Sequence, residues 1–216
     1  MAKRSAKTAA MERGFSLIEV LVAILIVMVG LLGLAGMQAR AQIAELESYQ
    51  RAQALVLLYD MMDRINNSRT TAPCYAVTTD TAAGTPYFGE GATATAACSL
   101  SNPSDQAMAN ASLNAWNDLL QGASEKKGAA ATKVGAMIGA RGCVSYDTGT
   151  EYINATSGAN VAGTGEYTVA VSWQGMADTF ASTKACAAGL YGTAAASDTK
   201  RRTVWATMRI GTLATR

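Results

Sequence analysis

The chain has 216 residues, of which half are apolar and 16% are charged, and its formal net charge is +2. This composition is neither that of a disordered chain nor that of a polytopic membrane protein, and the length allows one domain with its own core and an appendage. The sequence has no histidine, which excludes Ser-His-Asp and Cys-His nucleophilic sites and every zinc site that needs histidine.

The first element is a basic leader followed by a long apolar run. The first 14 residues hold four basic side chains and one acidic one, and residues 20–37 carry no charge. Eighteen helical residues rise ~27 Å at ~1.5 Å each, close to the thickness of a bilayer's hydrocarbon core, so the run predicts a membrane-spanning helix. Glu19 stands directly before it, where a carboxylate is costly unless it has a partner.

Three interpretations of this N-terminus are open. A secretory signal could be cleaved at Ala39-Arg40-Ala41, but such signals have apolar runs of about 7–15 residues without an acid near their start. A plain signal anchor would hold the basic leader in the cytoplasm, but it leaves Glu19 unexplained. The third interpretation rests on the motif Gly-Phe-Ser-Leu-Ile-Glu at 14–19, between the basic leader and the apolar helix. This motif resembles the class III signal of type IV pilins and related pseudopilins.

The resemblance implies how the N-terminus is processed. A prepilin peptidase would cleave between Gly14 and Phe15 on the cytoplasmic side of the inner membrane and then methylate the new Phe15 amine. The apolar helix would stay on the protein as its filament-packing core. Because Glu19 lies four residues after Phe15, one helical turn away, that amine is a suitable partner for its carboxylate, in the same or a neighbouring subunit. The pairing would help to set axial register during assembly.

The helix is expected to continue beyond the apolar run. Apolar residues recur at helical spacing through 38–68, and the first proline is Pro73. A helix over about 16–67 would be ~78 Å long. Gly30, Gly33 and Gly36 weaken it by ~1 kcal/mol each relative to alanine, which allows local melting, close helix approach or simple tolerance of glycine.

The remaining segments are expected to form a globular head. Residues 69–103 read as a loop-rich connector, and Ser101-Asn102-Pro103 starts a helix that ends near Gly122 with Trp116 as a core anchor. Residues 123–140 look flexible. Strands are predicted at 142–147, 167–173 and 203–210, the last two with the alternation of half-buried strands, and 175–200 reads as a long connection.

These elements predict an α+β fold, in which an antiparallel sheet packs against the C-terminal half of the long helix, as in pilins. The expected divisions are a leader at 1–14, a transmembrane and filament-core half-helix at 15–37, an amphipathic half-helix at 38–68 and a head domain at 69–216. Lys200-Arg201-Arg202 is a short basic cluster, interpreted as the solvated start of a strand rather than a phosphate site.

The four cysteines are Cys74, Cys98, Cys143 and Cys186, and none forms a C-x-x-C pair. An even number beyond a membrane segment indicates disulfides in an oxidising compartment, with buried free thiols as the alternative. Three connectivities are possible. Sequential pairing, Cys74 with Cys98 and Cys143 with Cys186, closes the shortest loops and is favoured.

Three further segments are similar to the PilV group of minor pilins, the type IV pilus modification proteins. They are 30–38 at the end of the apolar run, 60–66 at the end of the long helix, and 167–173 before Cys186 and the last strand. The similarity implies a minor pilin, placed near the pilus tip, that helps to initiate or modify assembly. Its partners would be other major and minor pilins, the prepilin peptidase and the inner membrane, with a periplasmic head that later reaches the cell surface.

Other functions remain as alternatives. A minor pseudopilin of type II secretion has the same membrane chemistry. A membrane-tethered periplasmic enzyme is disfavoured because the sequence shows no P-loop, no G-x-S-x-G and no paired-carboxylate cluster. An adhesin could use the loops rich in Thr, Ala and Gly. No cofactor, nucleic-acid partner or small-molecule substrate is indicated.

Overall fold

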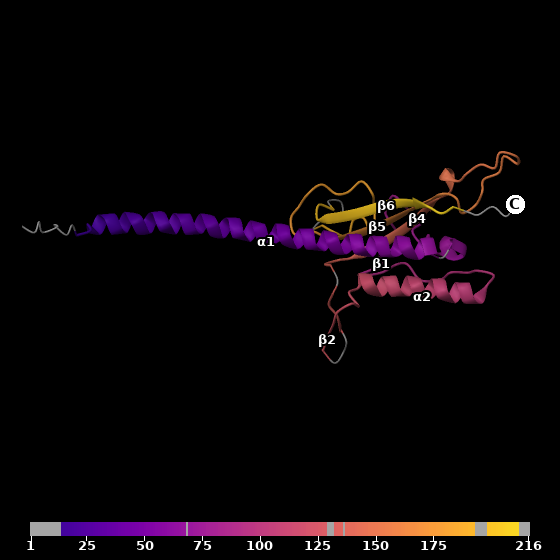
Figure 1. Cartoon of the computed structure of the whole chain (residues 1–216), viewed down its shortest axis with the longest axis horizontal. Coiled ribbons are helices and arrows are strands. Elements are labelled where there is room, and N and C mark those ends of the chain that lie inside the picture. Colours follow the sequence, from indigo (N-terminus) through magenta and orange to yellow (C-terminus); the bar gives the residue numbers. More distant parts are fainter. Residues whose placement is uncertain (1–13, 68, 129–131, 136, 193–197, 212–216) are drawn as a thin grey trace, which may run out of the picture. The chain divides into compact units, whose positions relative to one another are not determined.

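The structure is a computed structural model that describes residues 14–67, 69–128, 132–135, 137–192 and 198–211 (Figure 1). Its elements in chain order are α1 (Leu17–Asn67), η1 (Arg69–Tyr75), β1 (Phe88–Gly89), α2 (Pro103–Leu120), β2 (Lys126–Lys127), β3 (Thr132–Lys133), β4 (Arg141–Asp147), η2 (Thr148–Thr150), β5 (Glu166–Gln174) and β6 (Arg201–Arg209). The chain divides into two compact units, with the boundary between Glu45 and Leu46.

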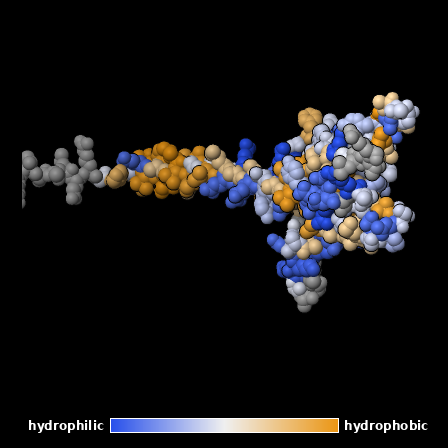
Figure 2. Space-filling model, turned by 45° about the vertical axis from the view of Figure 1, so that its right-hand side comes forward, coloured by the Kyte–Doolittle hydropathy of each residue, from blue (hydrophilic) through white to orange (hydrophobic). Residues whose placement is uncertain are grey.

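The first unit contains the N-terminal part of α1, which confirms the predicted helix. One 18-residue window of this helix has a mean hydropathy of 2.9, and none of that window is buried. Figure 2 shows an almost continuous apolar surface along this segment. The helix runs unbroken through Gly30, Gly33 and Gly36, and a Cβ added at any of the three would meet no described residue within 4 Å. By length and composition the segment could cross a membrane.

The second unit has a core between α1, α2 and a sheet. On α1, Ala54, Leu58, Met61 and Ile65 are buried at spacings of three and four residues, so they form one face of the helix. They belong to one apolar cluster with the inward side chains of the sheet, which include Tyr167, Val169, Val171 and Trp173. The predicted packing of the sheet against the C-terminal half of the long helix is therefore confirmed.

The sheet has the order β1-β4-β5-β6, and its neighbouring strands are antiparallel. The register pairs Val144 with Val169 and Val169 with Ala206. The strands predicted at 142–147, 167–173 and 203–210 correspond to β4, β5 and β6, and each boundary agrees within one or two residues.

The helix α2 begins and packs as its sequence predicts. The Asn102 side chain accepts a hydrogen bond from the Ser104 amide at 3.0 Å, so it caps the helix, and Pro103 occupies the first turn. Trp116 is fully buried, and its indole N–H donates to the Leu57 carbonyl of α1 at 3.0 Å. Gly142 of β4 lies directly under this indole, where any Cβ would collide with the ring.

The expectation of a half-buried β5 is wrong in the middle of the strand. Its inward face is buried as predicted, but Ala170 and Ser172 on the other face are buried as well. The cause is the connection between β5 and β6, which places Cys186, Ala187 and Tyr191 in a second apolar cluster with Ala170. A connection without periodicity thus forms a covering layer over the sheet.

Two other segments are more regular than the sequence indicates. The connector 69–103 contains η1 and also β1, which pairs with β4. Residues 123–140, expected to be flexible, contain the β2–β3 hairpin, in which Lys126 pairs with Lys133. Each pairing involves at least one strand of only two residues, which is too short to produce a recognisable alternation in the sequence.

Candidate functional site

The N-terminal segment brings the predicted processing and assembly residues into one short stretch. Gly14, Phe15 and Ser16 precede the helix, and the Ser16 carbonyl accepts hydrogen bonds from the amides of Glu19 and Val20 at 3.0 and 3.3 Å. The helix therefore begins at Leu17, and Glu19 lies in its first turn, where the positive end of the helix dipole stabilises a carboxylate by ~0.3–1 kcal/mol. Ser16 and Glu19 also have the spacing of a capping box.

Phe15 lies just before the helix, which agrees with the expected helix over about 16–67. In the chain that still carries its leader the Phe15 nitrogen is part of a peptide bond, so its pairing with Glu19 after cleavage stays a prediction. Phe15 is 82% exposed and Glu19 is exposed too. Among the described residues, the Glu19 carboxylate takes part in no hydrogen bond or ion pair, so nothing within the folded part of the chain neutralises it.

The cysteines lie in two separate places in the head. Cys74 of η1 is bonded to Cys98, which precedes α2, and the two Cα atoms are 5.1 Å apart. Cys143 of β4 is bonded to Cys186 in the connection between β5 and β6, with the Cα atoms 5.7 Å apart. The cysteines are thus paired sequentially. One bond links the segment before α2 to η1, and the other links the connection between β5 and β6 to β4.

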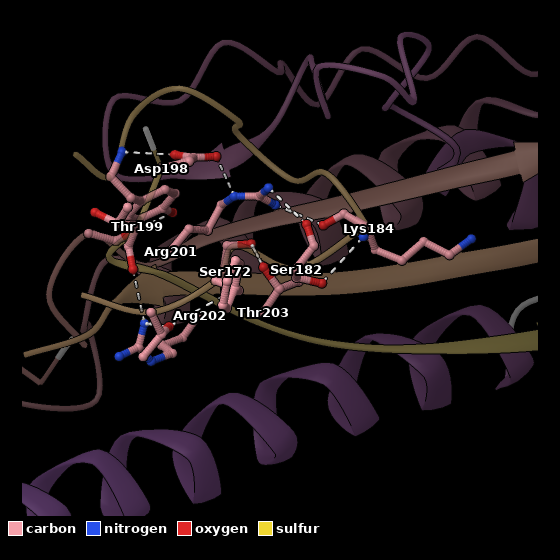
Figure 3. A network of polar contacts seen from close by, with 12 residues as sticks. Ser172, Ser182, Lys184, Asp198, Thr199, Arg201, Arg202 and Thr203 are labelled. Atoms are coloured by element: carbon pink, nitrogen blue, oxygen red, sulfur yellow. Dashed lines mark hydrogen bonds and ion pairs between the residues drawn. The ribbon is translucent and has the colours of Figure 1, made fainter. Parts of the chain in front are cut away.

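A polar network at the start of β6 is the main feature that the sequence analysis missed (Figure 3). Arg201 was expected to be solvated, but it is only 5% exposed. Its guanidinium forms an ion pair with Asp198 at 2.5 Å and donates to the carbonyls of Lys184 and Ser182 at 2.8 and 3.1 Å. The buried charge is therefore fully engaged in holding the connection 175–200 against the strand.

Arg202 connects the same segment to the head part of α1. Its guanidinium lies 3.2 Å from the Glu47 carboxylate, and the Met176 amide donates to the same carboxylate at 3.1 Å. It also donates to the Ala177 carbonyl at 2.8 Å. Glu47 carried no signal in the sequence, because its partner is 155 residues away in the chain.

Two buried tyrosines have perturbed acidity. Burial raises the pKa of the Tyr167 phenol to about 12, and the nearby Tyr146 and Glu151 act in the same direction. Burial also raises the pKa of Tyr191. The Tyr191 hydroxyl therefore keeps its proton and donates it to the Gly139 carbonyl at 2.8 Å. We therefore interpret both tyrosines as residues that stabilise the head.

No metal centre is apparent in the described part of the chain. Among these residues, no group of three His, Cys, Asp or Glu side chains could hold a metal ion.

Comparison with known families identifies the N-terminal segment. A family model described as the prokaryotic N-terminal methylation motif matches residues 10–35. The match includes Gly14, Phe15, Glu19 and most of the apolar run. Comparisons with curated proteins and with solved structures found no match.

Proposed function

We propose that this chain is a minor pilin, which enters a type IV pilus and helps to initiate or modify its assembly. The proposal is based on the prepilin-type methylation motif and the pilin-like α+β architecture. The observation that carries the proposal is the motif's position on a helix whose apolar segment is wholly exposed. Such a surface is stable only when a membrane or other apolar helices cover it, since each Å² of apolar surface removed from water contributes ~25 cal/mol. A filament core of packed pilin helices supplies that cover.

The proposed partners follow from the same segment. A prepilin peptidase would remove the leader between Gly14 and Phe15, the inner membrane would hold the apolar helix before assembly, and other major and minor pilins would surround it afterwards. Assignment to the PilV group rests on the three short segments 30–38, 60–66 and 167–173, and it is part of this proposal. The motif is typical of structural subunits rather than enzymes.

A periplasmic head is supported by the two disulfides, because such bonds persist in oxidising compartments. We expect non-reducing peptide mapping of the protein from its native host to recover Cys74 linked to Cys98 and Cys143 linked to Cys186. Closing loops of this size typically contributes ~2–4 kcal/mol to stability, so reduction should lower the unfolding temperature of the head. Four free thiols in freshly isolated protein would contradict the periplasmic location.

The test of the function separates a pilus from a type II secretion machine, whose minor pseudopilins are the second candidate. Filaments are sheared from cells and the chain is detected by immunoblotting, in the wild type and in strains that lack either the pilus extension ATPase or the secretion ATPase. If the chain is a pilus subunit, it should be absent from the sheared fraction only in the strain that lacks the pilus ATPase. Loss that follows the secretion ATPase instead would assign the chain to the secretion machine.

A further inference from the structure

The head has a polar pocket of about 380 Å³ between its part of α1 and the strands β5 and β6. We call it the α1–β6 pocket. It is lined by Glu47, Ser48 and Arg51 of α1, by Trp173 of β5 and by Arg202, Thr203 and Val204 of β6. Trp173 and Arg202 are paired across the two strands, and β6 is the last strand of the sheet. The pocket therefore lies at the edge of the sheet.

One wall of this pocket contains a hydrogen-bond donor without an acceptor. Trp173 is only 3% exposed, and its buried indole N–H has no hydrogen-bond partner among the described residues. The indole of Trp116 in the same head differs, because its N–H donates to the Leu57 carbonyl at 3.0 Å. Nearly all buried polar groups in proteins have a partner, since an unsatisfied one costs free energy. A ligand that accepts a hydrogen bond from Trp173 would remove this cost.

The pocket also contains one positive charge without a counter-ion. The guanidinium of Arg202 lies 3.2 Å from the Glu47 carboxylate, so these two charges balance each other (Figure 3). Arg51 lies one helical turn after Glu47 and is exposed, and within the described part of the chain its guanidinium takes part in no hydrogen bond or ion pair. Two arginines and one glutamate leave a formal charge of +1 in the pocket.

A carboxylate matches these unused groups. Its single negative charge balances Arg51, and its two oxygens can accept parallel hydrogen bonds from a guanidinium and a further one from an indole N–H. A doubly charged phosphate would place excess negative charge beside Glu47, and an apolar ligand would leave the Trp173 N–H unsatisfied. We propose that the α1–β6 pocket binds a carboxylate group, which Arg51 and the Trp173 N–H hold in place.

Gln50 is the competing partner for the indole. Its side-chain oxygen is also buried, and no donor reaches it from the described residues. A direct bond between Gln50 and Trp173 would satisfy both groups without any ligand. Gln50 does not line the pocket, so a carboxylate bound there and an internal bond to Gln50 predict different responses to added ligand.

The indole resonance of Trp173 measures whether the pocket is occupied. The full-length chain is purified in detergent micelles with ¹⁵N in its three tryptophans, and the Trp173 signal is identified by its loss in the Trp173→Phe variant. Sodium acetate, added at an ionic strength held constant with sodium chloride, should move this signal downfield until it saturates, because the N–H gains an acceptor. The Trp116 signal should stay in place, since its N–H already has a partner.

Two arginine variants test the charge that holds the ligand. Arg51→Gln should weaken acetate binding at least about tenfold, which corresponds to ~1.4 kcal/mol, and should leave the Trp116 signal unchanged. Arg40→Gln is the matched control, because Arg40 is an exposed arginine of the same helix outside the pocket and its loss should leave the titration as in the wild type.

The titration decides the proposal. A saturating shift that Arg51→Gln weakens and Arg40→Gln does not supports it. No shift, an equal shift in the Arg51→Gln variant, or tighter binding of phosphate than of acetate would overturn it. A Trp173 signal that acetate leaves in place and Gln50→Leu moves would identify the internal bond to Gln50 instead.

Recovery in sheared filaments identifies the source of the carboxylate. If an acidic side chain of an assembly partner supplies it, Arg51→Gln should lower recovery of the chain relative to the wild type. Equal recovery together with lost acetate binding assigns the pocket to a free carboxylate. The titration uses isolated protein, so the binding site and the proposed filament function can fail independently of each other.

Discussion

Replacing Glu19 with alanine is expected to leave leader cleavage and membrane insertion intact while the chain is almost lost from sheared filaments. Insertion should be equal or better, since the change removes the desolvation cost of an acid beside the apolar run. Assembly should suffer because the Phe15 amine of a neighbouring subunit would lose its carboxylate partner in an apolar core. The Glu19 carboxylate has no partner among the described residues, and the Phe15 amine that cleavage would release, in the same or a neighbouring subunit, is the expected source of the compensating charge.

The size of the Glu19 effect can be bounded. Removing one partner of a buried ion pair costs ~3–5 kcal/mol, because the remaining charge is uncompensated. Water, helix carbonyls or loss of the amine proton would relieve part of this cost, but ~1.4 kcal/mol already lowers incorporation tenfold. Quantitative immunoblots of membrane and sheared fractions measure the ratio. Glu45→Ala, at an exposed acid later in the same helix, is the matched control. Equal incorporation of the Glu19 and Glu45 variants would show that Glu19 does not guide assembly.

Replacing Gly14 with valine is expected to produce an uncleaved precursor that inserts into the membrane and does not reach filaments. A residue without a side chain suits a protease site beside the membrane, and a β-branched side chain there would obstruct the peptidase. Among the described residues, nothing lies within 4 Å of a Cβ built at Gly14, so the substitution should not disturb their folding. The whole effect would therefore arise at the cleavage step.

N-terminal sequencing measures the outcome of the Gly14 substitution. The wild-type protein should begin at Phe15 with a methylated amine, and the Gly14→Val protein should keep its leader. Gly36→Val is the control, since that glycine also has open space around it but lies far from the junction. A wild-type protein that begins at Ala41 or later would instead identify an ordinary secretory signal and refute the processing scheme.

The regular elements could be predicted because their signals are local. The apolar run and the absence of proline before Pro73 predicted α1, Asn102 and Pro103 predicted the start of α2, and alternation predicted β5 and β6. Each signal depends on the spacing of residues within a single element. For the same reason the role of Trp116 as a core residue and the buried face of the long helix from Ala54 to Ile65 could be predicted from the sequence. The same helical spacing also assigned Ile43 and Leu46 to that face, but both are exposed.

The contacts between distant segments could not be predicted. Arg201 belongs to a basic triplet, and only the burial of its side chain beside Asp198 distinguishes it from a solvated cation. Glu47 and Arg202 are far apart in the chain, so neither identifies the other. At the N-terminus the expected helix start at about residue 16 agrees with the observed start at Leu17, whereas the pairing of Glu19 with a Phe15 amine stays a prediction because that amine exists only after cleavage.

The two disulfides have a mechanical consequence for a domain under tension. A pulled chain lengthens by the extended length of every segment that unfolds. The Cys143–Cys186 bond closes a segment with a sequence separation of 43 residues, which would otherwise release roughly 140–155 Å at ~3.3–3.6 Å per residue. While that bond is intact, the force passes through the sulfur atoms, and residues 144–185, which include β5, bear no tension even if β5 separates from β6.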